Sequence, residues 1–384
     1  MRTPISEHHR LSSIDTLRGF ALLGILVMNI QSFAMISAAY TFPNLHMDIS
    51  GVNLVIWTLS HIFADLKFTA IFFMLFGAVV ILATQRRDQA GKRTWTYHYA
   101  RTFWLLIFGM IHAYFIWYGD ILVTYALCGF VVYWFRNFSA PLLFFIGGIS
   151  LLIALLIMMS AGVAPTDVQQ GILRDFVPNT AEIDREIAAY RGTWSDVQNA
   201  RLIEVLDIQF AGIPFFLFWR AGGLMLIGMA LLKLGVSVLI GFPLVAHNAV
   251  QLIGHNWDPS FSLLQHGGVY NYLGSIGVAL FYVGCIMLIS KKTIWHALQA
   301  RLAAVGRMAF TNYILQSVIA TGLFYGYGFG LFGAVERWGQ VLIVLIIWAF
   351  QLWMSPVWLS KFRFGPLEWL WRSLTYFKFQ AMLK

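Results

Sequence analysis

Long apolar runs separated by short polar segments dominate the chain, and this pattern predicts membrane-spanning helices. Many of the runs reach about 20 residues, the length that an α-helix needs to cross a bilayer. The strands of membrane β-barrels instead appear as short segments in which apolar and polar residues alternate, so the expected fold class is all-α. We expect about ten spans, at roughly residues 14–36, 53–82, 97–117, 120–136, 140–162, 210–232, 236–254, 269–290, 308–328 and 339–359.

Residues 163–207 interrupt this pattern with a large share of all the charged side chains. We expect a soluble loop there, with one amphipathic helix from about Thr180 to Leu206. The loop divides the chain into a first five-helix half over residues 1–162, which carries the polar motifs, and a second half over residues 208–384. The second half is expected to end in a short interfacial helix that begins near Pro366.

Composition supports the membrane class. Of the 384 residues, 59% are hydrophobic and only 11% are charged, whereas a soluble domain has roughly 25% charged residues. The net charge of +9 does not indicate nucleic-acid binding, because basic residues gather on the cytoplasmic loops of helical membrane proteins. Cys128 and Cys285 lie in separate apolar runs without metal-ligand spacing, so we expect packing residues and no disulfide.

The distribution of lysine and arginine predicts the orientation. The segment "QRRDQAGKR" at residues 85–93 and most other basic residues fall at the same ends of the spans as the two termini. The positive-inside rule then predicts that both termini are cytoplasmic.

The first span carries polar residues that are costly in hydrocarbon. In "SSIDTLRGFALLGILVMNIQSF", Asp15 and Arg18 stand at the entrance and Asn29 lies deep inside. Arg18 and Asn29 are eleven residues apart, which places them on one helix face about 16 Å from each other. The stripe either lines a polar ligand site, or Asp15 and Arg18 fix the helix end while Asn29 joins two helices.

The third span repeats this spacing with Arg101 and His112. His112 is either a satisfied core residue or a general base. Gly109, one turn earlier, would let a backbone or a ligand come close. Asp120 opens the fourth span, where a carboxylate is either a helix cap or part of the same site.

Lys67 lies near the middle of the second span, where an ammonium group must pair, snorkel or lose its proton. It is therefore a candidate functional residue. His61 and Asp65 have the spacing of two metal ligands, but there is no third ligand nearby, so no metal site is predicted.

In the second half, Arg307 begins a span in which Asn312 and Gln316 share a face. These two amides either bind a ligand or join helices. Near the C-terminus, Glu368 and Arg372 have the spacing of an ion pair within one helix.

Five blocks stand out along the chain: "IDTLRGFALLGILVMNI", "KFTAIFFMLFG", "RTFWLLIFGMIHAYFIWYGDILVTYALCG", "GRMAFTNYILQS" and "FGPLEWLWR". Together they resemble the YeiB-type family of bacterial inner-membrane proteins. The opening block also resembles the transmembrane acyltransferase superfamily that includes heparan glucosaminide N-acetyltransferase.

The resemblance implies a bacterial inner-membrane protein that takes acetyl-CoA or another acyl-CoA from the cytoplasm. The acyl group would pass to a carbohydrate or lipid acceptor on the far side. His112 would act in catalysis, helped by Asn29, Lys67 and Asp120. Membrane lipids are the expected surroundings, and a homodimer is left open. The expected residues of the acyl-CoA site are Asp15, Arg18, Arg86, Arg87, Arg93, Arg101, Arg307, Asn312 and Gln316.

Two other classes stay open. Five spans, a loop and five further spans are also compatible with a transporter or a lipid-handling protein, which would act without CoA. A structural membrane protein without any chemistry would use the buried polar residues only for stability.

Overall fold

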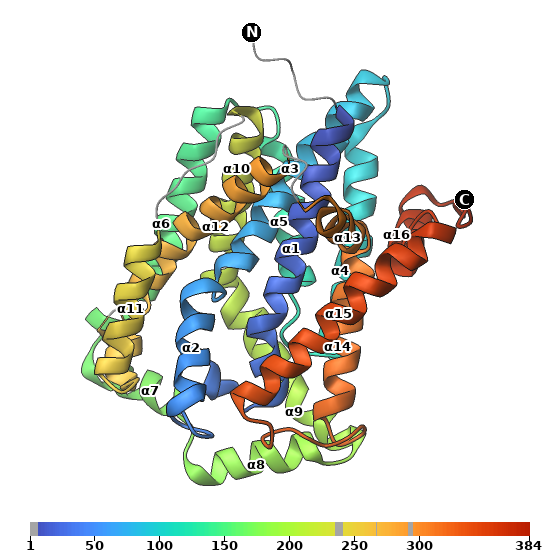
Figure 1. Ribbon diagram of the computed structural model, residues 1–384. Coiled ribbons are helices and arrows are strands. Elements are labelled where there is room, and N and C mark those ends of the chain that lie inside the picture. Colours follow the sequence, from blue (N-terminus) through green and yellow to red (C-terminus); the bar gives the residue numbers. More distant parts are fainter. Residues whose placement is uncertain (1–6, 235–240, 266, 291–294) are drawn as a thin grey trace.

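The structure is a computed structural model that describes residues 7–234, 241–265, 267–290 and 295–384 (Figure 1). Regular structure in these ranges is helical, apart from an isolated antiparallel bridge between Phe362 and Leu383. The all-α prediction is confirmed.

The first part of the chain contains the predicted spans, with one break. The span expected over 53–82 is two helices, because Leu66 adopts a left-handed backbone conformation with a φ of 63°. The prediction of one continuous helix there is wrong. The elements are α1 (Glu7–Ala34), η1 (Ser37–Tyr40), α2 (Gly51–Phe63), α3 (Lys67–Gln89), α4 (Thr94–Phe115), α5 (Leu122–Val132), η2 (Tyr133–Phe135) and α6 (Ala140–Val163).

The charged segment is also more divided than predicted. It forms α7 (Thr166–Phe176), α8 (Thr180–Arg191) and α9 (Trp194–Asp207). The single helix expected over residues 180–206 is wrong because Thr193 begins a new helix: its side chain accepts a hydrogen bond from the backbone N–H of Asp196. Such a reciprocal cap satisfies free N–H groups at a helix start.

The second part contains two π-helices, η3 and η4, and η3 forms the start of the span expected over 210–232. The span expected over 236–254 begins partly outside the described residues. The elements are η3 (Ile208–Leu217), α10 (Phe218–Leu234), α11 (Phe242–Gly254), η4 (Ser260–Leu264), α12 (Val269–Ile289), α13 (His296–Arg307), α14 (Ala309–Phe324), α15 (Arg337–Lys361) and α16 (Pro366–Tyr376).

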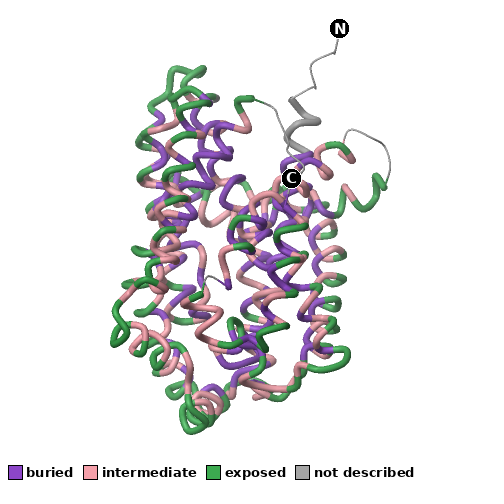
Figure 2. The backbone as a smooth tube through the Cα atoms, turned by 90° about the vertical axis from the view of Figure 1, so that its left-hand side faces the viewer, coloured by how far each residue is buried: buried purple, intermediate pink, exposed green. Residues whose placement is uncertain are grey.

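The outward faces of the long helices are apolar. Phe145 on α6 is 65% exposed and Ile346 on α15 is 68% exposed, although both are large and hydrophobic. Figure 2 shows how such exposed positions follow the outer sides of helices whose inner sides are buried. Six helical stretches among the described residues are long and apolar enough to cross a bilayer. The chain is therefore a helical, multi-pass membrane protein; the count of ten spans stays a prediction.

Glycines bring α1 and α13 into close contact. A Cβ atom on Gly19 would lie 2.0 Å from the carbonyl oxygen of Leu302, and one on Gly306 would lie 1.9 Å from the carbonyl oxygen of Asp15. This contact places Arg18 beside the end of α13. In Figure 1 the start of α1 and the helix α16 lie in the upper half of the molecule, and α8 lies at the opposite end.

Candidate functional site

A cavity of about 350 Å³ opens between α1, α3, α4, α5, α13, α14 and α16. On two of the helices that form its wall, an arginine precedes the aliphatic lining residues. On α1 the lining runs from Arg18 to Leu22 and Ile25, and on α4 it runs from Tyr97 and Arg101 to Leu105. The cavity therefore has a basic mouth and an apolar interior. Its other apolar lining residues include Phe72, Leu75, Phe76, Val79, Ile121, Leu122, Ala309 and Phe310.

The basic mouth suits an anionic ligand. Four arginines line the cavity, and Glu368 is the one carboxylate among its described lining residues; the arginines are Arg18, Arg101, Arg307 and Arg372. Planar guanidinium groups bind phosphate oxygens well, and several cations around one mouth attract anions from solution.

Two of these arginines are held in place by neighbours. Arg18 donates a hydrogen bond to Asp15 over 2.8 Å, so the predicted Asp15–Arg18 pair is present at the start of α1. Arg101 lies over the ring of Trp371, 4.5 Å from the ring centroid, and the indole N–H of Trp371 donates to the Arg101 carbonyl. α16, the short helix expected near Pro366, thus forms part of the cavity wall.

Glu368 does not form the predicted pair with Arg372. Its carboxylate accepts hydrogen bonds from the backbone N–H groups of Phe310, over 2.7 Å, and Thr311, over 3.0 Å. It caps the start of α14, where free N–H groups and the helix dipole favour an anion. Burial raises the pKa of Glu368. Arg372 lies over the ring of Phe364 instead.

His112 stands at the centre of a second arrangement. Its Nδ1 atom lies 2.7 Å from Oδ1 of Asp120, and its Nε2 atom lies 2.9 Å from Oγ of Ser317. Asp120 also accepts a hydrogen bond from the backbone N–H of Val123, so it both caps α5 and orients the histidine. Because the carboxylate accepts from Nδ1–H, Nε2 is the basic nitrogen. His112 is only 1% exposed.

His112 lies directly behind the inner end of the cavity. Tyr313 lines the cavity, and its ring centroid is 5.1 Å from that of His112. The expectation for Gly109 is confirmed, since a Cβ atom there would lie 2.7 Å from the backbone nitrogen of Val123. The close contact of α4 with α5 brings Asp120 beside His112.

Beyond His112, on the side away from the cavity, several buried polar atoms have no partner among the described residues. They are the indole nitrogen of Trp117, the hydroxyls of Tyr190 and Tyr325, and Nε and one terminal nitrogen of Arg201. The Trp117 ring lies 6.2 Å from that of His112, and the Tyr190 and Tyr325 rings lie 4.9 Å apart. Buried polar groups usually have a partner, so this group has the character of a hydrated or ligand-binding region.

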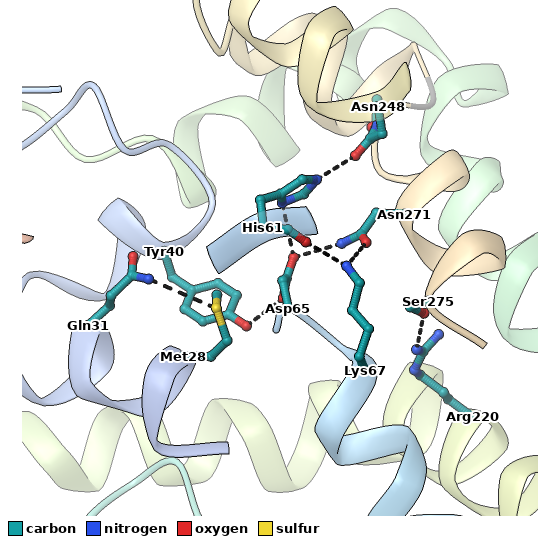
Figure 3. A network of polar contacts seen from close by, with 11 residues as sticks. Met28, Gln31, Tyr40, His61, Asp65, Lys67, Arg220, Asn248, Asn271 and Ser275 are labelled. Atoms are coloured by element: carbon teal, nitrogen blue, oxygen red, sulfur yellow. Dashed lines mark hydrogen bonds and ion pairs between the residues drawn. The ribbon is translucent and has the colours of Figure 1, made fainter. Parts of the chain in front are cut away.

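Lys67 belongs to a different centre (Figure 3). Its ammonium group is fully buried and donates to the carbonyl of His61 and to the side chain of Asn271, both over 2.6 Å. Asn271 in turn donates to Asp65 over 2.7 Å. Lys67 therefore joins the end of α2 to α12 and does not stand beside His112.

Further polar residues complete this centre. His61 lies 2.9 Å from Asn248 and 3.3 Å from Asp65. Arg220 donates to Ser275, and Figure 3 places it next to Lys67. Within the described ranges, no group of three metal-binding side chains comes together.

Asn29, Arg87 and Arg93 lie outside the cavity wall. Asn29 is half-buried on α1 and does not line the cavity. Arg87 lies over Tyr97, a cavity residue, and donates to the carbonyl of Arg93, which is exposed. The side chain of Arg86 lies outside the described residues.

Asn312 and Gln316 connect two helices. Asn312 donates to Ser355 over 3.0 Å, and Gln316 donates to Gln351 over 2.9 Å, so both amides bind α15. Neither lines the cavity. Of the two readings left open by the sequence, the structure supports helix joining.

The sequence alone did not single out Ser317, Tyr313 or Tyr125. Tyr125 lines the cavity, and its hydroxyl is buried without a partner in the described part of the chain. Each is an ordinary residue for a membrane helix, and only the three-dimensional arrangement distinguishes them.

Comparison with known proteins connects the whole chain to bacterial relatives. Residues 229–378 match the family described as "Protein of unknown function (DUF418)". The chain is 32% identical to "Uncharacterized protein YxaH" of Bacillus subtilis (strain 168), with 99% of this chain and 98% of the relative covered. It is 30% identical to "Uncharacterized protein YeiB" of Escherichia coli (strain K12), with 94% and 95% covered. No solved structure matches significantly.

Proposed function

Since this chain belongs to the YeiB family of membrane proteins, we propose that it is a membrane-embedded acyltransferase. It takes an acyl group, in the simplest case acetyl, from an acyl-CoA and transfers it to an acceptor on the other side of the membrane. The observation that carries this proposal is the position of His112 and Asp120 directly behind a cavity with a basic mouth and an apolar interior.

The arginines and the apolar lining of the cavity support this choice of donor. The phosphates of CoA bind at the mouth to Arg18, Arg101, Arg307 and Arg372, and the pantetheine arm with its thioester lies along the apolar wall. Arg101 and His112 are eleven residues apart on α4, about 16 Å along the helix. An extended pantetheine arm spans a distance of this order.

His112 supplies the base. Nε2 takes the proton from the attacking group, and Asp120 stabilises the imidazolium that forms. The Tyr125 hydroxyl, which has no partner in the described part of the chain, donates a hydrogen bond to the thioester oxygen as negative charge develops there. Asn29 and Lys67, which the resemblance implies as helpers of His112, do not line the cavity, and Lys67 donates to Asn271 instead.

The direction of transfer follows from the proposed orientation. The cavity mouth is at the basic end of the spans, which the positive-inside rule assigns to the cytoplasm of a bacterial inner membrane, together with both termini. The polar group around Tyr325 and Arg201 is then extracytoplasmic and receives the acceptor, a carbohydrate or a lipid.

The proposal is tested by transfer in proteoliposomes. Labelled acetyl-CoA is supplied on one side and p-nitrophenyl glycosides or octanol on the other, with wild type and His112→Ala compared. We expect labelled acceptor with wild type only. Equal transfer by His112→Ala contradicts the proposal.

The centre around Lys67 favours a second candidate function, transport without CoA. A helix broken inside the membrane, with buried charges at the break, is a feature of transporters. Uptake of a solute by vesicles that contain no CoA, lost in Lys67→Met, would support transport over acyl transfer.

A further inference from the structure

We infer that Ser317 carries the acyl group between donor and acceptor, as an oxygen ester that forms and breaks with the help of His112. This inference rests on the proposed function and deepens it. Neither the sequence pattern nor the family resemblance assigns a role to Ser317.

Ser317 completes a chain of three side chains linked by hydrogen bonds. Asp120 lies 2.7 Å from His112, and His112 lies 2.9 Å from Ser317. This order of carboxylate, imidazole and hydroxyl turns a hydroxyl into a nucleophile, because the imidazole accepts its proton and the carboxylate stabilises the resulting cation. Since the three residues come from α14, α4 and the connection to α5, no local sequence preference brings them together.

The Ser317 hydroxyl makes a shorter contact with the histidine than with the carbonyl one turn earlier in its own helix. Hydroxyls in membrane helices commonly donate to the carbonyl one turn earlier, as Thr84 does to Val80 over 2.8 Å. The corresponding distance from Ser317 to the Tyr313 carbonyl is 3.4 Å, longer than the 2.9 Å to His112. The contact with His112 is therefore the shorter of the two.

The position of Ser317 suits a residue that meets two substrates in turn. It lies eight residues after Ala309, which lines the cavity, and eight residues before Tyr325, in the outer polar group. Each interval corresponds to about 12 Å along α14. Ser317 is only 1% exposed, so a thioester reaches it when the Tyr313 ring, which lines the inner end of the cavity, moves aside.

The first step loads the serine. Oγ of Ser317 attacks the thioester carbonyl carbon, and Nε2 of His112 takes the hydroxyl proton. The carbon–sulfur bond then breaks, and the CoA sulfur receives that proton and leaves as a thiol. The product is an acyl ester on Ser317 with His112 neutral again.

The second step transfers the acyl group from Ser317 to the acceptor. The acceptor hydroxyl attacks the ester carbonyl carbon while Nε2 of His112 takes its proton. The bond from the carbonyl carbon to Oγ breaks, and Oγ of Ser317 recovers the proton. The acceptor leaves as an acyl ester, and no further reactant is needed.

The test is trapping of the loaded serine. Purified full-length protein is incubated with labelled acetyl-CoA without acceptor and quenched in acid. Peptide mass spectrometry then locates the acetyl group. We expect acetyl on Ser317 in wild type, none at that position in Ser317→Ala, and a thioester on the new cysteine in Ser317→Cys.

The matched control is Ser355→Ala, which removes a buried serine hydroxyl that contacts α14 without facing His112. It should load Ser317 as wild type does, while Ser317→Ala should bind acetyl-CoA normally and transfer acetyl at least about 100-fold more slowly. If Ser317→Ala transfers at the wild-type rate, the inference is overturned although the acyltransferase stands. If wild type neither binds acetyl-CoA nor transfers acetyl, the proposed function fails and the inference with it.

Discussion

The carboxylate of Asp120 lies 2.7 Å from Nδ1 of His112, although the end of α4 separates the two residues in the chain. Asp120→Asn should lower the rate of acetyl transfer by about 10²- to 10⁴-fold, because an amide favours the wrong tautomer and does not stabilise the imidazolium. Binding of acetyl-CoA should stay within a factor of about two, since Asp120 does not line the cavity. Transfer rates and calorimetry measure the two effects separately. A large loss of binding with an unchanged rate would contradict the assigned role.

Arg101 and Arg307 line the basic mouth and should determine donor affinity. Arg101→Ala should weaken acetyl-CoA binding by about 10- to 100-fold, as expected when a charge-assisted hydrogen bond to phosphate is lost. Arg307→Ala should act in the same direction. Arg93→Ala is the control, because Arg93 is exposed and lies outside the cavity wall. Titration at low and high salt should show a smaller salt dependence for the two cavity variants than for the control.

Glu186 should give the stability a dependence on pH. Its carboxylate accepts a hydrogen bond from the backbone N–H of Ser37. Burial, and to a lesser extent the charge of Glu204, raises the pKa of Glu186 from 4.5 to about 7. The folded state binds the Glu186 proton more tightly than the unfolded state does. The contribution of this group to the free energy of unfolding is therefore fully present below pH 4.5 and is lost as the pH rises to about 7.

Thermal unfolding of wild type and Glu186→Gln from about pH 4 to about pH 8 measures this effect. The melting temperature of wild type should fall relative to that of Glu186→Gln as the pH rises across this range, because the variant has no proton to lose at this position. A difference that stays constant with pH would show that the Glu186 proton is not linked to folding.

Lys67 should matter for stability and not for the donor. Lys67→Met removes the buried ammonium beside Asp65 and Asn271, and leaving a buried charge without its partner costs about 3–5 kcal/mol. Thermal unfolding in detergent measures the loss, with Lys233→Met, at an exposed position, as the control. Variant protein that is still folded should bind acetyl-CoA as wild type does. A selective loss of acetyl-CoA binding would place Lys67 in the donor site after all.

The sequence predicts the helical architecture and some of the residues that the structure brings together: Arg18, Arg101 and Arg307 line the cavity, and Asp120 lies beside His112. Apolar runs identify the long helices, since burial and membrane contact both need them. Arg101 and His112 are eleven residues apart, nearly three whole turns, so they lie on one face of α4. In the structure Arg101 lines the cavity and His112 contacts Tyr313 at its inner end. The same spacing on α1 does not extend to Asn29, since the cavity ends before that depth.

The rest depends on contacts between distant segments. The break at Leu66 is a left-handed conformation in a residue that rarely adopts it, and no glycine or proline marks it. The partner of Glu368 is the start of α14 and not its neighbour on α16. Ser317 acquires its significance only because α14 packs with its hydroxyl facing His112.

The measurement that tests the central claim most directly is calorimetric titration of detergent-purified protein with acetyl-CoA, with Arg101→Ala and His112→Ala alongside. The account predicts that wild type and His112→Ala bind with similar affinity and that Arg101→Ala binds at least about tenfold more weakly. Absence of binding by wild type, for acetyl-CoA and for longer acyl-CoAs alike, would contradict the account and leave the cavity to a different anionic ligand.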